Sequence, residues 1–166
     1  MANNFVEQLV TEWYEYRGYF VRRNVPVGKR AKGGGTECEL DIVAFDPVAP
    51  HLIHVEASMD AESWEKRERR FRKKFDAGLK YIPSLFPGLD LPREIEQISI
   101  FALASRVNHP TLAGRKVLLV SDLMREIMED LSDKKIAAAA VPEHHPILRT
   151  LQFVVEYRKK VFDTLR

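Results

Sequence analysis

Residues 36–58, TECELDIVAFDPVAPHLIHVEAS, predict a β-hairpin with a carboxylate in each of its two apolar strands. Two apolar, β-branched runs, Leu40–Phe45 and Leu52–Val55, are separated by the proline-containing turn DPVAP, which predicts two antiparallel strands. Asp41 lies inside the first run, and Glu56 closes the second. Because burying an unpaired carboxylate costs several kcal/mol, we expect a cationic partner close to Asp41 and Glu56.

The segments on either side of this hairpin show alternating helical and strand patterns. We predict helices over residues 3–17, 61–82 and 123–131 and from 146 onward, and strands over residues 19–27, 38–45, 52–57, 97–104 and 116–120. Short loops make the first three strands antiparallel, and the helix after them is a crossover to the next strand. The pattern therefore predicts an α/β fold with a mixed sheet and helices on both faces. The alanine-rich segment 135–141 fits either a helix or a strand.

Length and composition predict one soluble domain. The 166 residues are 45% hydrophobic and 30% charged, which is typical of a globular chain that buries its own core. We expect a single domain over 1–166, with its core at about 3–120 and C-terminal helices at about 121–166. The single cysteine, Cys38, excludes an internal disulfide and fits a reducing cytosol. No apolar stretch predicts a membrane span, and the N-terminus lacks a signal pattern, so we expect a cytoplasmic protein with no membrane partner.

Positive charge is clustered although the net charge is only +2. Lys29, Arg30 and Lys32 lie in the glycine-rich loop GKRAKGGG, and further lysines and arginines crowd residues 66–74. Local basic clusters on a near-neutral protein favour an anionic partner such as a phosphate backbone. Glutamates are interleaved with the second cluster, so that cluster fits a solvated helix face equally well.

Helical phase sorts the side chains of the predicted helix 61–82. The apolar stripe consists of Trp64, Phe71, Phe75, Leu79 and Ile82. Glu68 lies on this stripe and Arg67 and Lys74 flank it, so we expect these three residues nearest the sheet. The remaining cations of the helix are expected to face solvent.

Asp41 and Glu56 predict a metal site because they converge from paired strands. Together with the backbone carbonyl of Ala57, they supply the hard oxygen ligands that Mg²⁺ (or Mn²⁺) prefers. Such an ion lowers the pKa of bound water and neutralises charge on a phosphoryl group under attack. The alternative is that nearby cations pair with both carboxylates on an ordinary sheet. The histidines are expected at the surface or as caps rather than as ligands: His51, His54, His109, His144 and His145.

The order helix, three-strand meander, helix, strand, together with these carboxylates, resembles the PD-(D/E)XK nuclease superfamily, which has the restriction-endonuclease-like fold. The resemblance covers about residues 3–104 and implies an α-β-β-β-α-β core. It implies that Asp41 is the metal-binding aspartate and that Glu56 opens the acid–x–lysine element. The glutamate that some members carry on the first helix would match Glu7 or Glu12.

Ser58 is a departure from this family, because it stands where the family usually has a lysine that positions or activates the attacking water. Some members are similar in taking a basic residue from the following helix instead. By helical phase Lys74 or Arg67 can reach back, and Lys74 is favoured because an arginine is too basic to accept a proton.

These observations predict a Mg²⁺-dependent endonuclease that hydrolyses phosphodiester bonds in DNA, most simply double-stranded. The expected catalytic residues are Asp41, Glu56, Ser58 and Lys74, with Glu7, Glu39 or Glu68 close to the metal. The expected nucleic-acid contacts are Lys29, Arg30, Lys32 and Arg67. One alternative is a catalytically inactive nucleic-acid-binding module of the same fold. Another is a structural domain whose tail helix forms a homodimer.

Overall fold

The computed structural model describes residues 4–30, 33–104 and 108–163. Its helices are α1 (Phe5–Tyr16), α2 (Trp64–Tyr81), α3 (Val120–Leu131), α4 (Pro146–Glu156) and α5 (Arg158–Asp163), with short 3-10 helices at Ile82–Leu85 and Ile136–Ala138. Its strands are β1 (Phe20–Lys29), β2 (Thr36–Asp46), β3 (His51–Ser58), β4 (Glu96–Phe101), β5 (Thr111–Leu112) and β6 (Arg115–Leu119). The undecided segment 135–141 thus contains only a three-residue 3-10 helix.

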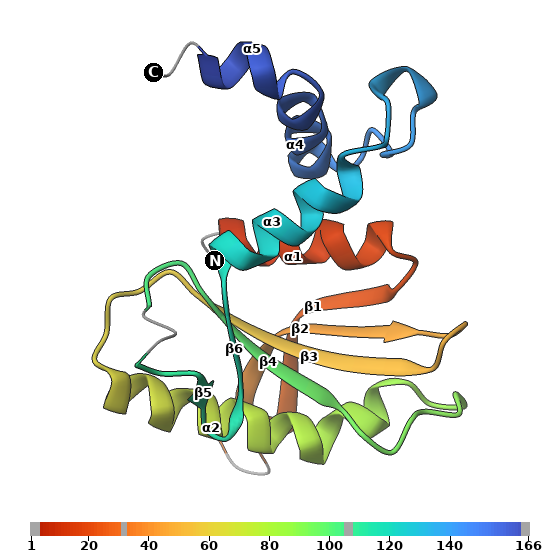
Figure 1. The fold of residues 1–166 in the computed structure, drawn as a ribbon. Helices are drawn as coiled ribbons and strands as arrows, with labels where there is room; N and C mark the ends of the chain where they lie inside the picture. Colours follow the sequence, from red (N-terminus) through yellow and green to blue (C-terminus); the bar gives the residue numbers. More distant parts are fainter. Residues whose placement is uncertain (1–3, 31–32, 105–107, 164–166) are drawn as a thin grey trace.

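The six strands form one mixed sheet in the order β1-β2-β3-β4-β6-β5. β1, β2 and β3 are antiparallel neighbours, whereas β3 pairs with β4 and β4 with β6 in parallel. A parallel pair needs a crossover, and α2 provides it between β3 and β4. Figure 1 shows α2 on one face of the sheet and α1, α3 and α4 on the other. The predicted α/β fold with a mixed, two-sided sheet is confirmed.

Helix α1 links the sheet to the C-terminal helices. The Asn4 side chain caps its first turn by accepting from Val6 N at 3.0 Å. Leu9 and Trp13 are buried in the core between α1 and the sheet. On the opposite side, Glu12 Oε2 accepts from the backbone N–H groups of Ile147 at 2.9 Å and Leu148 at 3.1 Å. Glu12 therefore caps α4, since the first N–H groups of a helix lack partners within it.

Helix α2 packs on the other face with most of the predicted stripe. Phe71, Phe75 and Ile82 are buried, but Leu79 is 45% exposed, so its predicted place on the stripe is wrong. Gly78 takes the contact with the sheet instead, directly above His54. A Cβ at this position would lie 2.3 Å from His54 Nδ1, so α2 can pack this close here only because Gly78 has no side chain.

The C-terminal part differs from the prediction in two details. α3 begins at Val120, and the Asp122 side chain accepts from Leu119 N at 3.4 Å. The two-residue strand β5 lies between the predicted strands 97–104 and 116–120, where we predicted no element, and pairs with β6. Within the described parts of the chain, no helix combines the length and the apolar composition needed to cross a membrane.

Candidate functional site

The predicted hairpin loses its regular pairing at Asp41. The β2–β3 register ends at Ile42 opposite Val55, and Asn24, the β1 residue facing Asp41, has a φ of +48°. Leu40 packs beneath α2 while Ile42 packs beneath α1, so the usual alternation of faces is interrupted at Asp41. The two strands diverge at the residue that carries the first carboxylate.

Side chains replace the backbone bonds that are lost where β2 and β3 diverge. Asp41 N donates to Glu56 Oε1 at 3.2 Å, and Ala57 N donates to Asp41 Oδ2 at 3.0 Å. Because buried N–H groups need partners, each carboxylate has one oxygen committed to the backbone of the other strand. The other oxygens, Asp41 Oδ1 and Glu56 Oε2, remain for a cation.

Lys74 from α2 meets both of these remaining oxygens. Its Nζ lies 2.5 Å from Asp41 Oδ1 and also contacts Glu56 Oε2. The Glu56 side chain is fully buried, the Asp41 side chain is 12% exposed and the Lys74 side chain 21%. Of the two residues expected to reach back from α2, Lys74 is the one that contacts the carboxylates.

Two carboxylates and one ammonium leave this site short of positive charge. Burial, and then the charge of Glu56, raise the pKa of Asp41 to about 7 despite Lys74. Burial also raises the pKa of Glu56. Burial alone would lower the pKa of Lys74, but the charges of Glu56 and Asp41 outweigh it and raise that pKa. Lys74 is therefore an ammonium that donates hydrogen bonds, and the proton-accepting role that favoured it in the sequence does not fit this arrangement.

His54 lies behind Glu56, and the expectation of a surface or capping role for it is wrong. It is fully buried, and its Nε2 lies 2.7 Å from Glu56 Oε1. Burial, and then the charge of Lys74, lower the pKa of His54 to about 3, so the contact is a hydrogen bond from a neutral ring rather than an ion pair. The spacing of two between His54, Glu56 and Ser58, all buried, was the sequence signal for a shared strand face.

Ser58 belongs to a neighbouring cluster that fixes the loop between β3 and α2. Its hydroxyl donates to Asp60, and Arg70 Nη2 lies 3.2 Å from Ser58 Oγ and 2.5 Å from Asp60 Oδ2. Burial would raise the pKa of Asp60, but hydrogen bonds from Ser58 and Arg70 outweigh it and hold this pKa well below its usual range. Arg70, expected to face solvent, therefore lies beside the site.

Arg67 is directed at the same loop and not at the carboxylates. Its Nε donates to Asp60 Oδ1 at 3.1 Å, and its guanidinium lies 4.8 Å from the centre of the Phe101 ring. Arg67 is only 5% exposed and its guanidinium is bonded to Asp60, so its placement does not favour the nucleic-acid contact that we expected from it. Its charge is instead used to anchor the residues that follow β3.

A cavity of ≈ 320 Å³ opens onto these groups. Its lining comprises Asn4, Glu7, Asp41, Glu56, Ala57, Ser58, Met59, Asp60, Arg70, Phe71 and Lys74. Burial and the charge of Asp41 raise the pKa of Glu7, so Glu7 is the α1 glutamate at the site, whereas Glu12 caps α4. Glu39 does not line the cavity, and Glu68 accepts from Ala113 N at 2.8 Å beside β5.

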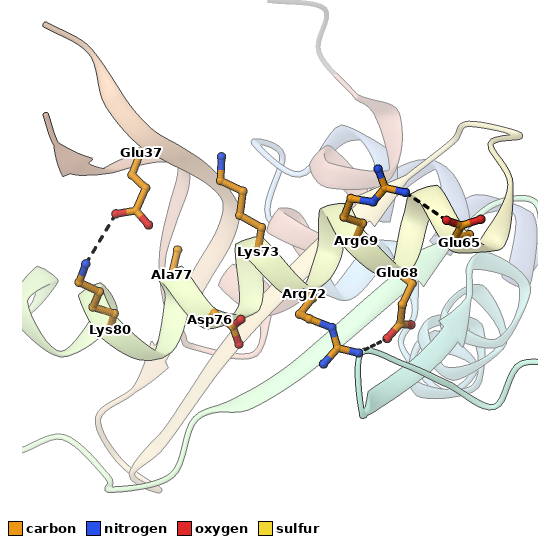
Figure 2. A pocket seen from close by; sticks show the side chains of 9 residues that line it. All are labelled: Glu37, Glu65, Glu68, Arg69, Arg72, Lys73, Asp76, Ala77 and Lys80. Carbon is orange, nitrogen blue, oxygen red and sulfur yellow. Dashed lines mark hydrogen bonds and ion pairs between the residues drawn. The ribbon is translucent and has the colours of Figure 1, made fainter. Parts of the chain in front are cut away.

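The solvent side of α2 carries a larger depression of ≈ 600 Å³, shown in Figure 2. Its charges are largely paired with each other: Arg69 with Glu65, Arg72 with Glu68, and Lys80 with Glu37. None of the buried carboxylates lines it. Size alone would favour this depression, but mutually paired surface charges are typical of a solvated helix, so we place the candidate site at the smaller cavity.

The residues at the smaller cavity fit a divalent cation in their chemistry. Within residues 4–30, 33–104 and 108–163, no group of three or more histidine, cysteine, aspartate and glutamate side chains is arranged for a metal. Mg²⁺, however, is usually held by one or two carboxylates and water. Asp41 and Glu56 each have an oxygen not bound to backbone, and the Ala57 carbonyl lies on the same edge of β3 as its N–H, which faces Asp41. The pKa of Asp41 shows that one ammonium does not satisfy the pair.

The expected nucleic-acid residues outside the cavity are only partly described. Lys29 and Arg30 are exposed at the end of β1, on the loop that returns to β2. Lys32 lies outside the described residues.

Comparisons with known proteins do not identify a family. No family model matches the chain, and no curated protein matches it. A similar solved structure is the crystal structure of the protein of unknown function AF1548, with 13% sequence identity and a TM-score of 0.44 over 96% of this chain and 98% of that chain. A likeness at this level carries no argument about function.

Proposed function

We propose that this protein is a Mg²⁺- or Mn²⁺-dependent endonuclease of the restriction-endonuclease-like fold that hydrolyses phosphodiester bonds in double-stranded DNA. The observation that carries the proposal is the contact of Lys74 with both Asp41 and Glu56 at the wall of a cavity. A carboxylate pair on adjacent strands with a lysine at its side is the arrangement that the sequence resemblance implies. Here the lysine comes from α2, in place of Ser58.

Asp41, Glu56 and the Ala57 carbonyl would hold the metal. When bound, the ion supplies charge neutralisation at the phosphoryl group and lowers the pKa of water. Asp41 and Glu56 offer it the two oxygens that Lys74 now contacts. Lys74 and the cation therefore compete for these oxygens, and the cavity must admit both for catalysis.

Lys74 contributes a positive charge and three N–H donors to the cavity. Released from one carboxylate, its ammonium can donate to a phosphoryl oxygen, where charge develops during hydrolysis. Ser58 cannot replace it, because its hydroxyl is uncharged and donates to Asp60. Arg70 lines the same cavity with a side chain that is 40% exposed, and it would be a second cation for the substrate once released from Asp60 and Glu62.

We infer double-stranded DNA as the substrate because the protein has exposed cations outside the cavity as well as inside it. Lys29 and Arg30 at the end of β1 would contact backbone phosphates, which fix register without reading sequence. A homodimer would place two such cavities on one duplex, one for each strand.

A nucleic-acid-binding module without cleavage is the second candidate. Lys74 already contacts both free carboxylate oxygens, and the Ser58 hydroxyl donates to Asp60, so each of these groups has a hydrogen-bond partner without a metal, although one ammonium does not balance two carboxylates. Such a module would bind DNA with strong salt dependence and cut it under no metal.

A cleavage assay on plasmid and linear duplex DNA separates the two. We expect the wild-type protein to cut with Mg²⁺ or Mn²⁺ and not with EDTA, and Asp41→Asn to cut at least about 100-fold more slowly, because the metal loses a charged ligand. Equal melting temperatures would show that both proteins are folded. Cleavage by Asp41→Asn at the wild-type rate, or by neither protein under any metal, would rule out the catalytic proposal, and salt-sensitive binding alone would then favour the second candidate.

A further inference from the structure

A chain of buried polar groups leads from Glu56 away from the cavity. His54 Nε2 lies 2.7 Å from Glu56 Oε1, and His54 Nδ1 lies 3.1 Å from Gln97 Nε2. Gln97 also contacts the Phe75 carbonyl at 2.9 Å through Nε2 and Arg115 Nε at 2.7 Å through Oε1. His54 and Gln97 are 0% and 4% exposed, so each N–H group of these two side chains needs an acceptor within the protein.

The two ends of the chain fix the direction of every hydrogen bond in it. A guanidinium only donates, so the Gln97 atom facing Arg115 is the amide oxygen. A backbone carbonyl only accepts, so the atom facing Phe75 O is the amide nitrogen. The second hydrogen of that nitrogen is directed at His54 Nδ1, which must accept it. A neutral imidazole that accepts at Nδ1 carries its proton on Nε2, facing Glu56.

We propose that His54 is a positioning residue that, as a neutral imidazole protonated on Nε2, donates to Glu56 Oε1 and thereby directs Glu56 Oε2 into the cavity. With the bond from Asp41 N, Oε1 has two donors, and Oε2 faces Lys74. Gln97 and Arg115 act through His54 by fixing its tautomer. One step rests on the proposed function, namely that Glu56 Oε2 binds a divalent metal ion.

The packing around His54 leaves its ring one orientation. Phe75 packs edge-on against it, with ring centroids 5.5 Å apart at 82°. A Cβ at Gly78 would lie 2.3 Å from His54 Nδ1, so α2 rests directly on the imidazole. Lys74 is one helical turn before Gly78, so the contact that holds the ring also sets the height of Lys74 above Glu56.

Nitrogen-15 NMR of the histidine rings tests the tautomer in the metal-free wild-type protein. We expect the His54 ring to be protonated on Nε2 and not on Nδ1 at pH 7. The Lys74 ammonium should exchange slowly with water, because two carboxylates hold it. A ring protonated on Nδ1, or on both nitrogens, would overturn the proposal whether or not the protein cuts DNA.

Three variants then test positioning. His54→Gln keeps an N–H donor near the Nε2 position, His54→Leu removes it, and Gln97→Glu replaces the donor to Nδ1 by an acceptor, which should move the ring proton to Nδ1. His51→Gln is the matched control, because His51 lies on the same strand but pairs with Glu96 with its side chain 38% exposed. Melting temperatures identify any variant that fails to fold.

We expect Mn²⁺ affinity, measured by calorimetry, to fall about 10–100-fold in His54→Leu and Gln97→Glu and to stay near wild type in His54→Gln and His51→Gln. The slowly exchanging Lys74 signal should be lost in His54→Leu and Gln97→Glu and kept in His54→Gln and His51→Gln. Wild-type affinity and an intact Lys74 signal in His54→Leu would overturn the proposal. If neither wild type nor Asp41→Asn binds Mn²⁺ or cuts DNA, the proposed function fails by itself, and the ring tautomer and the Lys74 signal still decide the role of His54.

Discussion

Lys74 Nζ lies 2.5 Å from Asp41 Oδ1, although 33 positions separate the two residues in the sequence. The contact joins α2 to the sheet at the site, and the same ammonium contacts Glu56. It explains how a fully buried glutamate is tolerated, because the charge of Glu56 is matched by Lys74 and by the donors on its second oxygen.

Lys74→Met tests the importance of this contact. We expect cleavage to fall about 100-fold or more, because a charged donor to the reacting phosphate is removed. The free energy of unfolding at pH 8 should fall by about 3 kcal/mol, since two buried carboxylates lose their cation. Lys73→Met is the control at the adjacent, exposed position and should change neither quantity. Wild-type cleavage rates in folded Lys74→Met would contradict the role of this lysine.

Asp41→Asn should stabilise the protein in alkaline solution. The pKa of Asp41 is raised from its usual value of 3.8 to about 7 in the folded state, so between these pH values the folded state keeps a proton that the unfolded state loses. Stability therefore falls as pH rises from about 4 to about 7, and the cost is complete above 7. We expect the variant to exceed wild type by roughly 1–3 kcal/mol at pH 8, less than the full shift implies because Lys74 loses a partner.

Chemical denaturation at pH 4, 6 and 8 measures this difference. It should be smallest at pH 4, close to the usual pKa of 3.8, because the folded-state carboxyl is protonated there and the unfolded-state carboxyl is still partly protonated. A variant that is less stable than wild type at pH 8 would show that Lys74 fully compensates the buried charge of Asp41.

Gly78→Ala should destabilise the fold, although alanine is normally the better helix residue. At an exposed helical position this change gains up to about 1 kcal/mol. Here the new Cβ would lie 2.3 Å from His54 Nδ1, so α2 must shift, and we expect a loss of about 1–3 kcal/mol and weaker cleavage. Asp76→Ala, at an exposed position of the same helix, is the control. A gain of stability in Gly78→Ala would show that α2 does not rest on His54.

Much of the fold follows from local sequence patterns. The hairpin between Leu40 and Val55 has β-branched runs and a proline-rich turn, and the long helix after it has a single apolar stripe. These features predict the antiparallel β1, β2 and β3 and the crossover helix, and the structure has β3 and β4 parallel on either side of that helix. Leu79 breaks the pattern because a glycine beside it takes the contact with the sheet.

The candidate site was only half predictable. Asp41, Glu56 and the reach of Lys74 follow from charge in apolar strands and from helical phase. His54 was missed because a histidine in an apolar run is compatible with surface and core alike. Only its partner Gln97 on β4, which Arg115 on β6 holds in turn, distinguishes the two. The roles of Arg67 and Arg70 depend on Asp60, whose loop has no periodicity to place it.

A crystal of the protein soaked in Mn²⁺ at pH 8, where Asp41 is ionised, tests whether Asp41 and Glu56 bind a metal, because anomalous scattering locates the ion without reference to activity. We expect one strong peak bound by Asp41 and Glu56 together with the Ala57 carbonyl, and a Lys74 ammonium displaced from at least one carboxylate. A map with no peak at these residues, and with Lys74 still on both carboxylates, would contradict the metal-dependent site.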